Sequence, residues 1–125
     1  MKGINRSSLL GHLTADPELR KTKSGKSVAT FAVATNNEWF DQDGVQQSST
    51  DFHRIVAWEK RAELCAKHLH KGSPVFVEGR LTNRSYEGSD GSRRYINEII
   101  LSDIYVLEWL TSKKTVGIKE LADKK

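Results

Sequence analysis

Apolar and polar residues alternate along much of this chain, which is the spacing expected of β-strands that bury one side. In residues 51–58, Ile55 and Ala57 fall on one side and Phe52 and Trp58 on the other. From such alternation and from β-branched residues we predict strands over five ranges, 4–14, 28–36, 51–58, 74–86 and 93–107.

Residues 60–70 change to helical spacing, with an apolar stripe at i, i+3, i+4 and i+7. The stripe consists of Ala62, Cys65, Ala66 and Leu69, and Gly72 ends the helix. Three strands, a helix and two strands are the order of an OB-type Greek-key barrel. We therefore expect an all-β, five-stranded OB-fold barrel with one α-helix between strands 3 and 4, an architecture that commonly binds oligonucleotides. A fold alone does not fix a function.

The segments between these elements are polar. Residues 37–50 lack an apolar period and predict a long mobile excursion, while the Gly- and Ser-rich residues 87–92 predict a flexible hairpin tip. After about residue 110 the pattern dissolves. We expect one domain over residues 1–110 and a basic C-terminal tail over 111–125, with at most a short helix at 118–122.

Composition adds a partner class and a compartment. The 125 residues carry a formal net charge of +4, which favours an anionic partner without excluding a merely solvated basic surface. The single cysteine, Cys65, cannot form an internal disulfide, and no apolar run has the length of a membrane span or signal core. We expect a cytoplasmic protein that contacts no membrane.

Two predicted strands combine aromatic and cationic side chains on one side. In residues 51–58, Arg54 lies between Phe52 and Trp58, and in residues 74–86 Arg84 precedes Tyr86 by two positions. Aromatic rings can stack nucleobases of any identity while guanidinium groups neutralise phosphates. The alternative is that these rings belong to the barrel core or to a subunit contact.

Several ordered blocks of sequence are similar to one family. They are Gly3-Ile4-Asn5-Arg6, Gly11-His12-Leu13, Asp16-Pro17-Glu18-Leu19-Arg20, Phe31-Ala32-Val33-Ala34-Thr35, Asp51-Phe52-His53-Arg54-Ile55-Val56 and the stretch from Leu69 to Leu81. Through them, residues 1 to about 108 resemble the bacterial single-stranded DNA-binding protein family. The resemblance implies sequence-independent binding and protection of single-stranded DNA in replication, recombination and repair, by a homo-oligomer, with a tetramer favoured.

The resemblance also implies roles for particular residues. Base-stacking positions of the family correspond here to Trp39, Phe52, Trp58 and Tyr86. Phosphate contacts would come from Arg54, Lys60, Lys71, Arg80 and Arg84. We rank Arg54 first among the cations, because it lies between two aromatic residues.

The sequence departs from the family pattern at three places. Ser7-Ser8 stands where apolar strand residues are usual, in a region that the family uses for subunit contacts, and Glu59 stands where a glycine is usual. The chain ends in Lys124-Lys125 rather than in an acidic tip, so protein recruitment through an acidic tail is not expected.

Other functions find less support in the residues. No nucleophile, base and charge-stabilising group occur together, so an enzyme is not expected. Cys65 with His68 lacks the further ligands of a zinc site, and Asp41, Asp43 and Gly44 lack the later ligands of a calcium loop. No metal or cofactor is expected. Two alternatives stay open: an accessory OB-type module that docks to a replication or recombination partner and binds nucleic acid weakly, and an RNA-binding protein.

Overall fold

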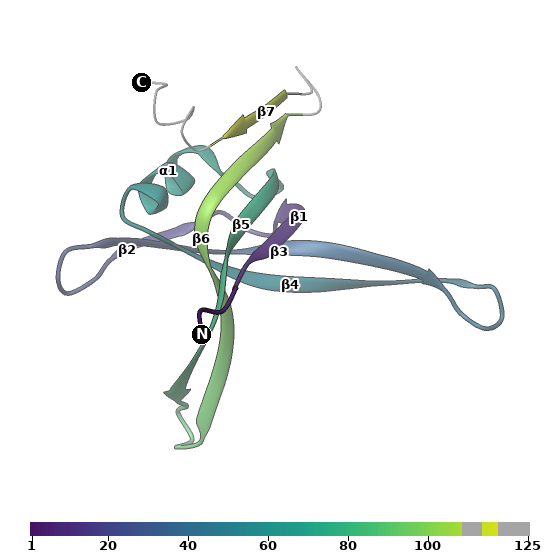
Figure 1. Cartoon of the computed structure of the whole chain (residues 1–125), viewed down its shortest axis with the longest axis horizontal. Helices are drawn as coiled ribbons and strands as arrows, with labels where there is room; N and C mark the ends of the chain where they lie inside the picture. Colours follow the sequence, from purple (N-terminus) through teal and green to yellow (C-terminus); the bar gives the residue numbers. More distant parts are fainter. Residues whose placement is uncertain (109–113, 118–125) are drawn as a thin grey trace.

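The computed structural model describes residues 1–108 and 114–117. The elements are β1 (Ser7–Leu13), β2 (Glu18–Lys21), β3 (Ser27–Phe40), β4 (Gln46–Trp58), α1 (Lys60–His68), β5 (Pro74–Glu87), β6 (Arg93–Glu108) and β7 (Lys114–Gly117). The strands are ordered β1-β5-β6-β4-β3-β2, and a short β1–β3 pairing closes the sheet into a barrel. Figure 1 shows two long β-hairpins that extend away from this barrel.

The five-stranded barrel predicted from the sequence is confirmed. The four residues of β2 form a small extra strand against β3, so the helix falls between β4 and β5, which are the third and fourth of the long strands. Alternate residues of these strands point inward and are fully buried, among them Val33, Ile55 and Val77. The inward side of each strand agrees with the predicted alternation.

Helix α1 packs on the barrel through the predicted stripe. Ala62, Cys65 and Leu69 are buried in the same core cluster as the strand residues. Burial raises the pKa of the Cys65 thiol to about 12, so this side chain is a packing residue and not a reactive thiolate. The helix ends at His68, two residues before the predicted end.

The residue before α1 has an unusual backbone. Glu59 has φ = 55°, and in the part of the chain that the structure describes it is the one non-glycine residue with positive φ. A side chain in this region costs about 1–3 kcal/mol. The conformation explains why glycine suits a position where this chain carries glutamate.

The prediction that residues 37–50 form a long mobile excursion between strands is wrong as to secondary structure, because most of this range is strand. Strands β3 and β4 continue through it as a paired ribbon from Asn36↔Thr50 to Phe40↔Gln46. Both sides of this ribbon face solvent, so its sequence needs no apolar alternation. Polar side chains bond across it instead, as where Thr50 Oγ1 donates to Asn36 Oδ1 at 2.9 Å.

The predicted tail is described only in part. Residues 114–117 form β7, whose backbone pairs with the end of β6. The short helix predicted at 118–122 lies outside the described residues, and the division at residue 110 stays a prediction. Within the described ranges, no helix has the length and apolar character needed to cross a membrane.

Candidate nucleic-acid interface

The pairing of β4, β6 and β5 decides which side chains share a surface. Strands β4 and β6 run parallel with Ile55 opposite Ile99, and both of these side chains are buried in the barrel. Residues one position away therefore point outward. Strand β5 joins the same surface through its pairing of Arg84 with Ile96. The outward side chains that concern us are Phe52, Arg54, Trp58, Arg80, Arg84, Tyr86 and Glu98, and we call this surface the outer face.

The four aromatic residues predicted to stack bases are all exposed. The exposed fractions are 68% for Phe52, 40% for Trp58, 46% for Tyr86 and 48% for Trp39. None of these rings is therefore a core residue of the barrel, which removes one of the two alternatives left open by the sequence.

Trp39 is separated from the other three rings. The β3–β4 register is continuous, and in it Trp39 pairs with Gln47. Both residues have odd numbers, which matters because successive side chains of a strand point to opposite sides. Odd positions of β3 point inward where the strand belongs to the barrel, as Phe31 and Val33 do. Trp39 thus lies on the opposite side of its hairpin from Phe52.

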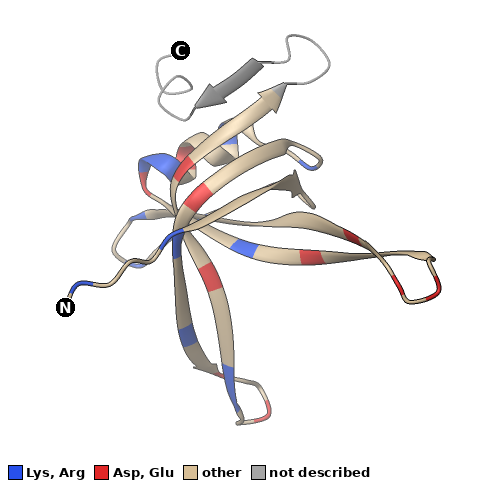
Figure 2. Ribbon diagram, turned by 45° about the vertical axis from the view of Figure 1, so that its right-hand side comes forward, with Lys and Arg blue, Asp and Glu red and all other residues tan. Residues whose placement is uncertain are grey.

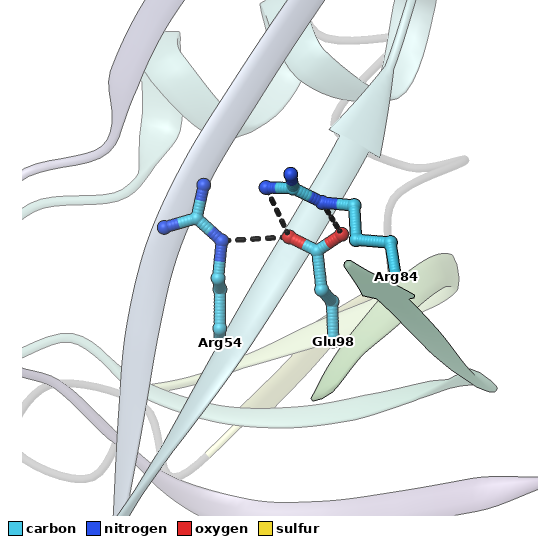
Figure 3. A network of polar contacts seen from close by, with 3 residues as sticks. All are labelled: Arg54, Arg84 and Glu98. Carbon is cyan, nitrogen blue, oxygen red and sulfur yellow. Dashed lines mark hydrogen bonds and ion pairs between the residues drawn. The ribbon is translucent and has the colours of Figure 1, made fainter. Parts of the chain in front are cut away.

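Glu98 lies between Arg54 and Arg84 on the outer face, as Figure 3 shows. Arg54 Nε donates to Glu98 Oε2 at 2.7 Å. Arg84 Nε donates to Glu98 Oε1 at 2.7 Å, and Arg84 Nη2 approaches Oε2 at 3.4 Å. The Glu98 side chain is only 6% exposed, and both Nη groups of Arg54 point away from it.

The three groups keep one another charged. Burial raises the pKa of the Glu98 carboxyl, but the hydrogen bonds and the positive charges of Arg84 and Arg54 together lower it by more, so the pKa lies below its ordinary value. The hydrogen bond to Glu98 in turn raises the pKa of Arg84. At neutral pH this cluster consists of two cations and one anion, and it retains a net positive charge that can attract a phosphate.

The remaining predicted cations are distributed differently. Arg80 lies on the outer face and lines a hollow of about 370 Å³ together with Arg6. Lys60 is the exposed first residue of α1, two positions after Trp58. Lys71 lies in the turn after α1, where its backbone N–H donates to Asp16 at 2.8 Å. Strand pairing therefore joins Arg54, Arg80 and Arg84 and leaves the two lysines outside the sheet surface.

Sequence reasoning missed Glu98, which joins Arg54 and Arg84 on the outer face, and it missed Tyr95 with the adjacent Arg93 and Arg94 on the same arm. Tyr95 is 76% exposed. It is the third residue of β6 and follows the exposed Arg93 and Arg94. The available signal was the pattern of a cation and an aromatic two positions apart, Arg93 and Tyr95, which is the pattern that singled out Phe52 with Arg54.

The two hairpins differ in charge: Figure 2 shows blue and red segments together on the β5–β6 hairpin and a red tip on the β3–β4 hairpin. Residues 80–98, which we call the β5–β6 arm, hold four arginines against three carboxylates. Residues 36–51, the β3–β4 arm, hold four carboxylates and no lysine or arginine. A polyanion would therefore be attracted to one arm and repelled by the tip of the other.

Comparison with known proteins identifies close relatives. A model of the Single-strand binding protein family matches residues 4–107. The "Single-stranded DNA-binding protein 1" of Chlorobaculum tepidum is 44% identical over 107 residues, which cover 85% of this chain and 66% of that protein. The "Single-stranded DNA-binding protein" of Bacillus cereus is 45% identical over 84% of this chain and 61% of its own length. The "Single-stranded DNA-binding protein" of Lactiplantibacillus plantarum is 44% identical over 84% of this chain and 52% of its own length. The chain thus spans between about half and two thirds of the length of these relatives.

One solved structure supports the fold as well. The Plasmodium falciparum SSB in complex with ssDNA is 36% identical and superposes with a TM-score of 0.79. The match covers 86% of this chain and 98% of that one. The resemblance inferred from the sequence blocks is confirmed by these findings.

Proposed function

The chain belongs to the single-strand binding protein family, and we propose that it binds single-stranded DNA without regard to base sequence. The observation that carries this proposal is the outer face, on which exposed rings of β4 and β5 alternate with arginines of the same strands. Its role would be to coat and protect single strands during replication, recombination and repair. Membership of a family of binding proteins supports the expectation that the chain is not an enzyme.

The chemistry of the outer face suits a flexible single strand. Phe52, Trp58 and Tyr86 offer rings on which unpaired bases can stack, each at about 1–3 kcal/mol. Arg54 and Arg84 offer guanidinium groups for the phosphates between those bases. Both kinds of contact use features common to every nucleotide, so affinity should depend little on base order. In a duplex the bases are already stacked, and the rings cannot reach them.

A titration with labelled dT oligomers tests the proposal. We expect binding that weakens as salt is raised, because phosphate neutralisation releases counterions, and duplex DNA of the same length should bind far more weakly. A competition between matched DNA and RNA oligomers addresses the RNA-binding alternative. Preference for one duplex sequence, stronger binding to RNA, or affinity indifferent to salt would contradict the proposal.

We further propose that the chain forms a homotetramer. Strand β1 pairs with β5 along Ser7–His12, but on its other edge only His12 and Leu13 are paired, with β3. The open edge and the exposed side chain of Leu10 offer a surface to a second copy. A single OB-type barrel spans only about 4–16 nucleotides, so several barrels are needed to wrap a long strand. Light scattering at micromolar concentration should give the tetramer mass, and a monomer or dimer mass would overturn this assignment.

A further inference from the structure

The reverse side of the β5–β6 arm carries an aromatic residue that the proposed outer face does not use. Tyr95 is 76% exposed, and no other aromatic ring in the described ranges is more exposed. Tyr95 pairs with Ser85, and the next pair along the arm is Tyr86 with Arg94. Tyr95 and Tyr86 therefore lie on opposite sides of the same arm.

A cation accompanies Tyr95 on that side. Arg93 is two positions before Tyr95 and so points to the same side of the strand. Its Nη1 donates to Ser85 Oγ at 2.9 Å, and Ser85 is the cross-strand partner of Tyr95. This hydrogen bond ties the guanidinium group to the residue opposite Tyr95, so the reverse side repeats the combination of cation and ring found on the outer face.

A hollow connects the two sides at the base of the arm. It has a volume of about 220 Å³ and is lined by Leu81, Asn97 and Ile99 from the reverse side, by Phe52, Arg54 and Glu98 from the outer face, and by His53. Leu81 is 45% exposed there, although its alternation with Val75 and Val77 predicts a core position. The hollow thus adjoins both the reverse side of the arm, at Leu81 and Asn97, and Phe52 of the outer face.

We propose that the reverse side of the β5–β6 arm is a second contact surface for the single strand, on which Tyr95 stacks a base and Arg93 meets the adjoining phosphate. This inference rests on the proposed function and extends it from one side of the arm to both. The strand follows the reverse side toward the hollow and reaches the outer face at Phe52.

The charge around the ring decides in favour of a nucleic acid. Phe40, at the tip of the β3–β4 arm, is 71% exposed and so comparable with Tyr95. Its neighbours are carboxylates, including Glu38 and Asp41, which repel phosphate. Tyr95 shares its side of the arm with Arg93, whereas Arg94 lies on the opposite side and forms an ion pair with Asp90. An exposed ring that shares its side with a cation is suited to a polyanion, whereas the equally exposed Phe40 is not.

The experiment compares variants of the full chain in titrations with labelled dT oligomers of graded length. Tyr95→Ala should weaken binding to long oligomers by at least about fivefold, the lower end expected for one lost stacked base. Tyr95→Phe keeps the ring and should bind within about twofold of the parent, since stacking is the contact at stake. Phe40→Ala is the matched control, because it removes an equally exposed ring from acidic surroundings, and it should leave affinity unchanged.

Arg93→Ala tests the cation separately. It should lower the dependence of log K on log salt by roughly 0.7, the contribution of one phosphate contact to a single strand. Because Tyr95 is solvent-exposed, its truncation should leave the thermal unfolding midpoint unchanged, which circular dichroism checks.

The outcomes separate this inference from the proposed function. If Tyr86→Ala weakens binding while Tyr95→Ala binds like the parent at every length, the second surface is refuted and the outer face stands. If the parent itself does not bind dT, the proposed function fails. If Tyr95→Ala alters the assembly mass in light scattering but not the affinity for dT, the ring contacts another copy of the chain, and the inference is wrong.

Discussion

The two arms of the barrel have the same construction and opposite chemistry. Each ends in a three-residue turn, in which the backbone N–H of the residue before the turn donates to the C=O of the residue after it, from Asp41 to Val45 at 3.0 Å and from Gly88 to Ser92 at 2.7 Å. In each, a glycine at the third turn position has positive φ, Gly44 at 77° and Gly91 at 83°. An aspartate side chain accepts hydrogen bonds at each turn. The backbone N–H of Val45 lowers the pKa of Asp41, and the hydroxyl and then the backbone N–H of Ser92 lower the pKa of Asp90.

The difference between the arms lies in the side chains that the common backbone carries. The β3–β4 arm is held by exposed amide and hydroxyl pairs among four carboxylates, whereas the β5–β6 arm carries four arginines, one of them bound to a buried carboxylate. The same type of turn therefore occurs in two different electrostatic environments. Under the proposed function, the DNA contacts should be concentrated on the β5–β6 arm and the adjoining barrel surface, and the β3–β4 arm should contribute less.

The largest expected effect compares two tryptophans. Trp58→Ala should weaken dT binding by about 1–3 kcal/mol, because Trp58 lies on the outer face, on the same side of β4 as Phe52 and Arg54. Trp39→Ala should cost about 1 kcal/mol or less, since its ring lies among carboxylates on the other side of the β3–β4 arm. Fluorescence anisotropy of labelled dT measures both. If Trp39→Ala lowers the affinity for dT as much as Trp58→Ala does, the proposed difference between the two arms is wrong.

Removal of the two arginines around Glu98 should destabilise the fold. Arg54→Ala with Arg84→Ala leaves a nearly buried carboxylate without its cations, at a cost of about 2 kcal/mol. The matched pair on the β3–β4 arm, Asn36→Ala with Thr50→Ala, removes an exposed hydrogen bond and should cost at most about 0.5 kcal/mol. Urea unfolding compares the two. Adding Glu98→Gln to the arginine variant should recover part of the loss, and a further loss would contradict the explanation.

The same cluster predicts a pH dependence. The pKa of Glu98 is depressed in the folded chain, so its contribution to stability is present above the unfolded pKa of about 4.3 and is lost as the pH falls through the lower folded value. Glu98→Gln should therefore flatten the acid limb of the stability curve, measured by unfolding from pH 7 downward. Parallel acid limbs in parent and variant would show that Glu98 is not responsible.

The two turns should respond alike to loss of glycine. A Cβ at Gly44 or at Gly91 would meet no atom within 4 Å, so substitution tests only the backbone conformation. Gly44→Ala and Gly91→Ala should each weaken the local hairpin by about 1 kcal/mol. Amide hydrogen exchange in each arm reports this as faster exchange by about fivefold. Unequal effects would mean that the arms differ in more than their side chains.

The smallest effect concerns the single charge of Asp51, which precedes Phe52 in the sequence and points to the other side of β4. Asp51→Asn removes a carboxylate from the base of the β3–β4 arm and should strengthen dT binding by about twofold at low salt, with the difference fading as salt is raised. Glu63→Gln on α1 is the control, because it makes the same charge change away from the outer face. Equal gains in both variants would indicate a dependence on net charge alone.

Several features followed from the sequence itself because they depend on neighbouring residues. The inward positions of Ile55 and Ala57, the stripe of α1 and the side shared by Phe52, Arg54 and Trp58 are set by the two-residue period of a strand and the 3.6-residue period of a helix. The glycine turns are local in the same sense, and the turn at Asp41–Val45 could have revealed the β3–β4 hairpin. Alternation could not reveal it, because a ribbon solvated on both sides has no buried side to mark.

Tertiary structure alone decided the rest, because strand order and register join residues distant in the chain. Glu98 lies 44 positions from Arg54, and only the parallel pairing of β4 with β6 brings the two side chains together. The continuous β3–β4 register separates Trp39 from Phe52, although both suit stacking by type. The departure of the β5–β6 arm from the barrel leaves Leu81 exposed where alternation predicts burial. Local sequence determines which side of its own strand a residue occupies, and only the assembled sheet determines what it meets there.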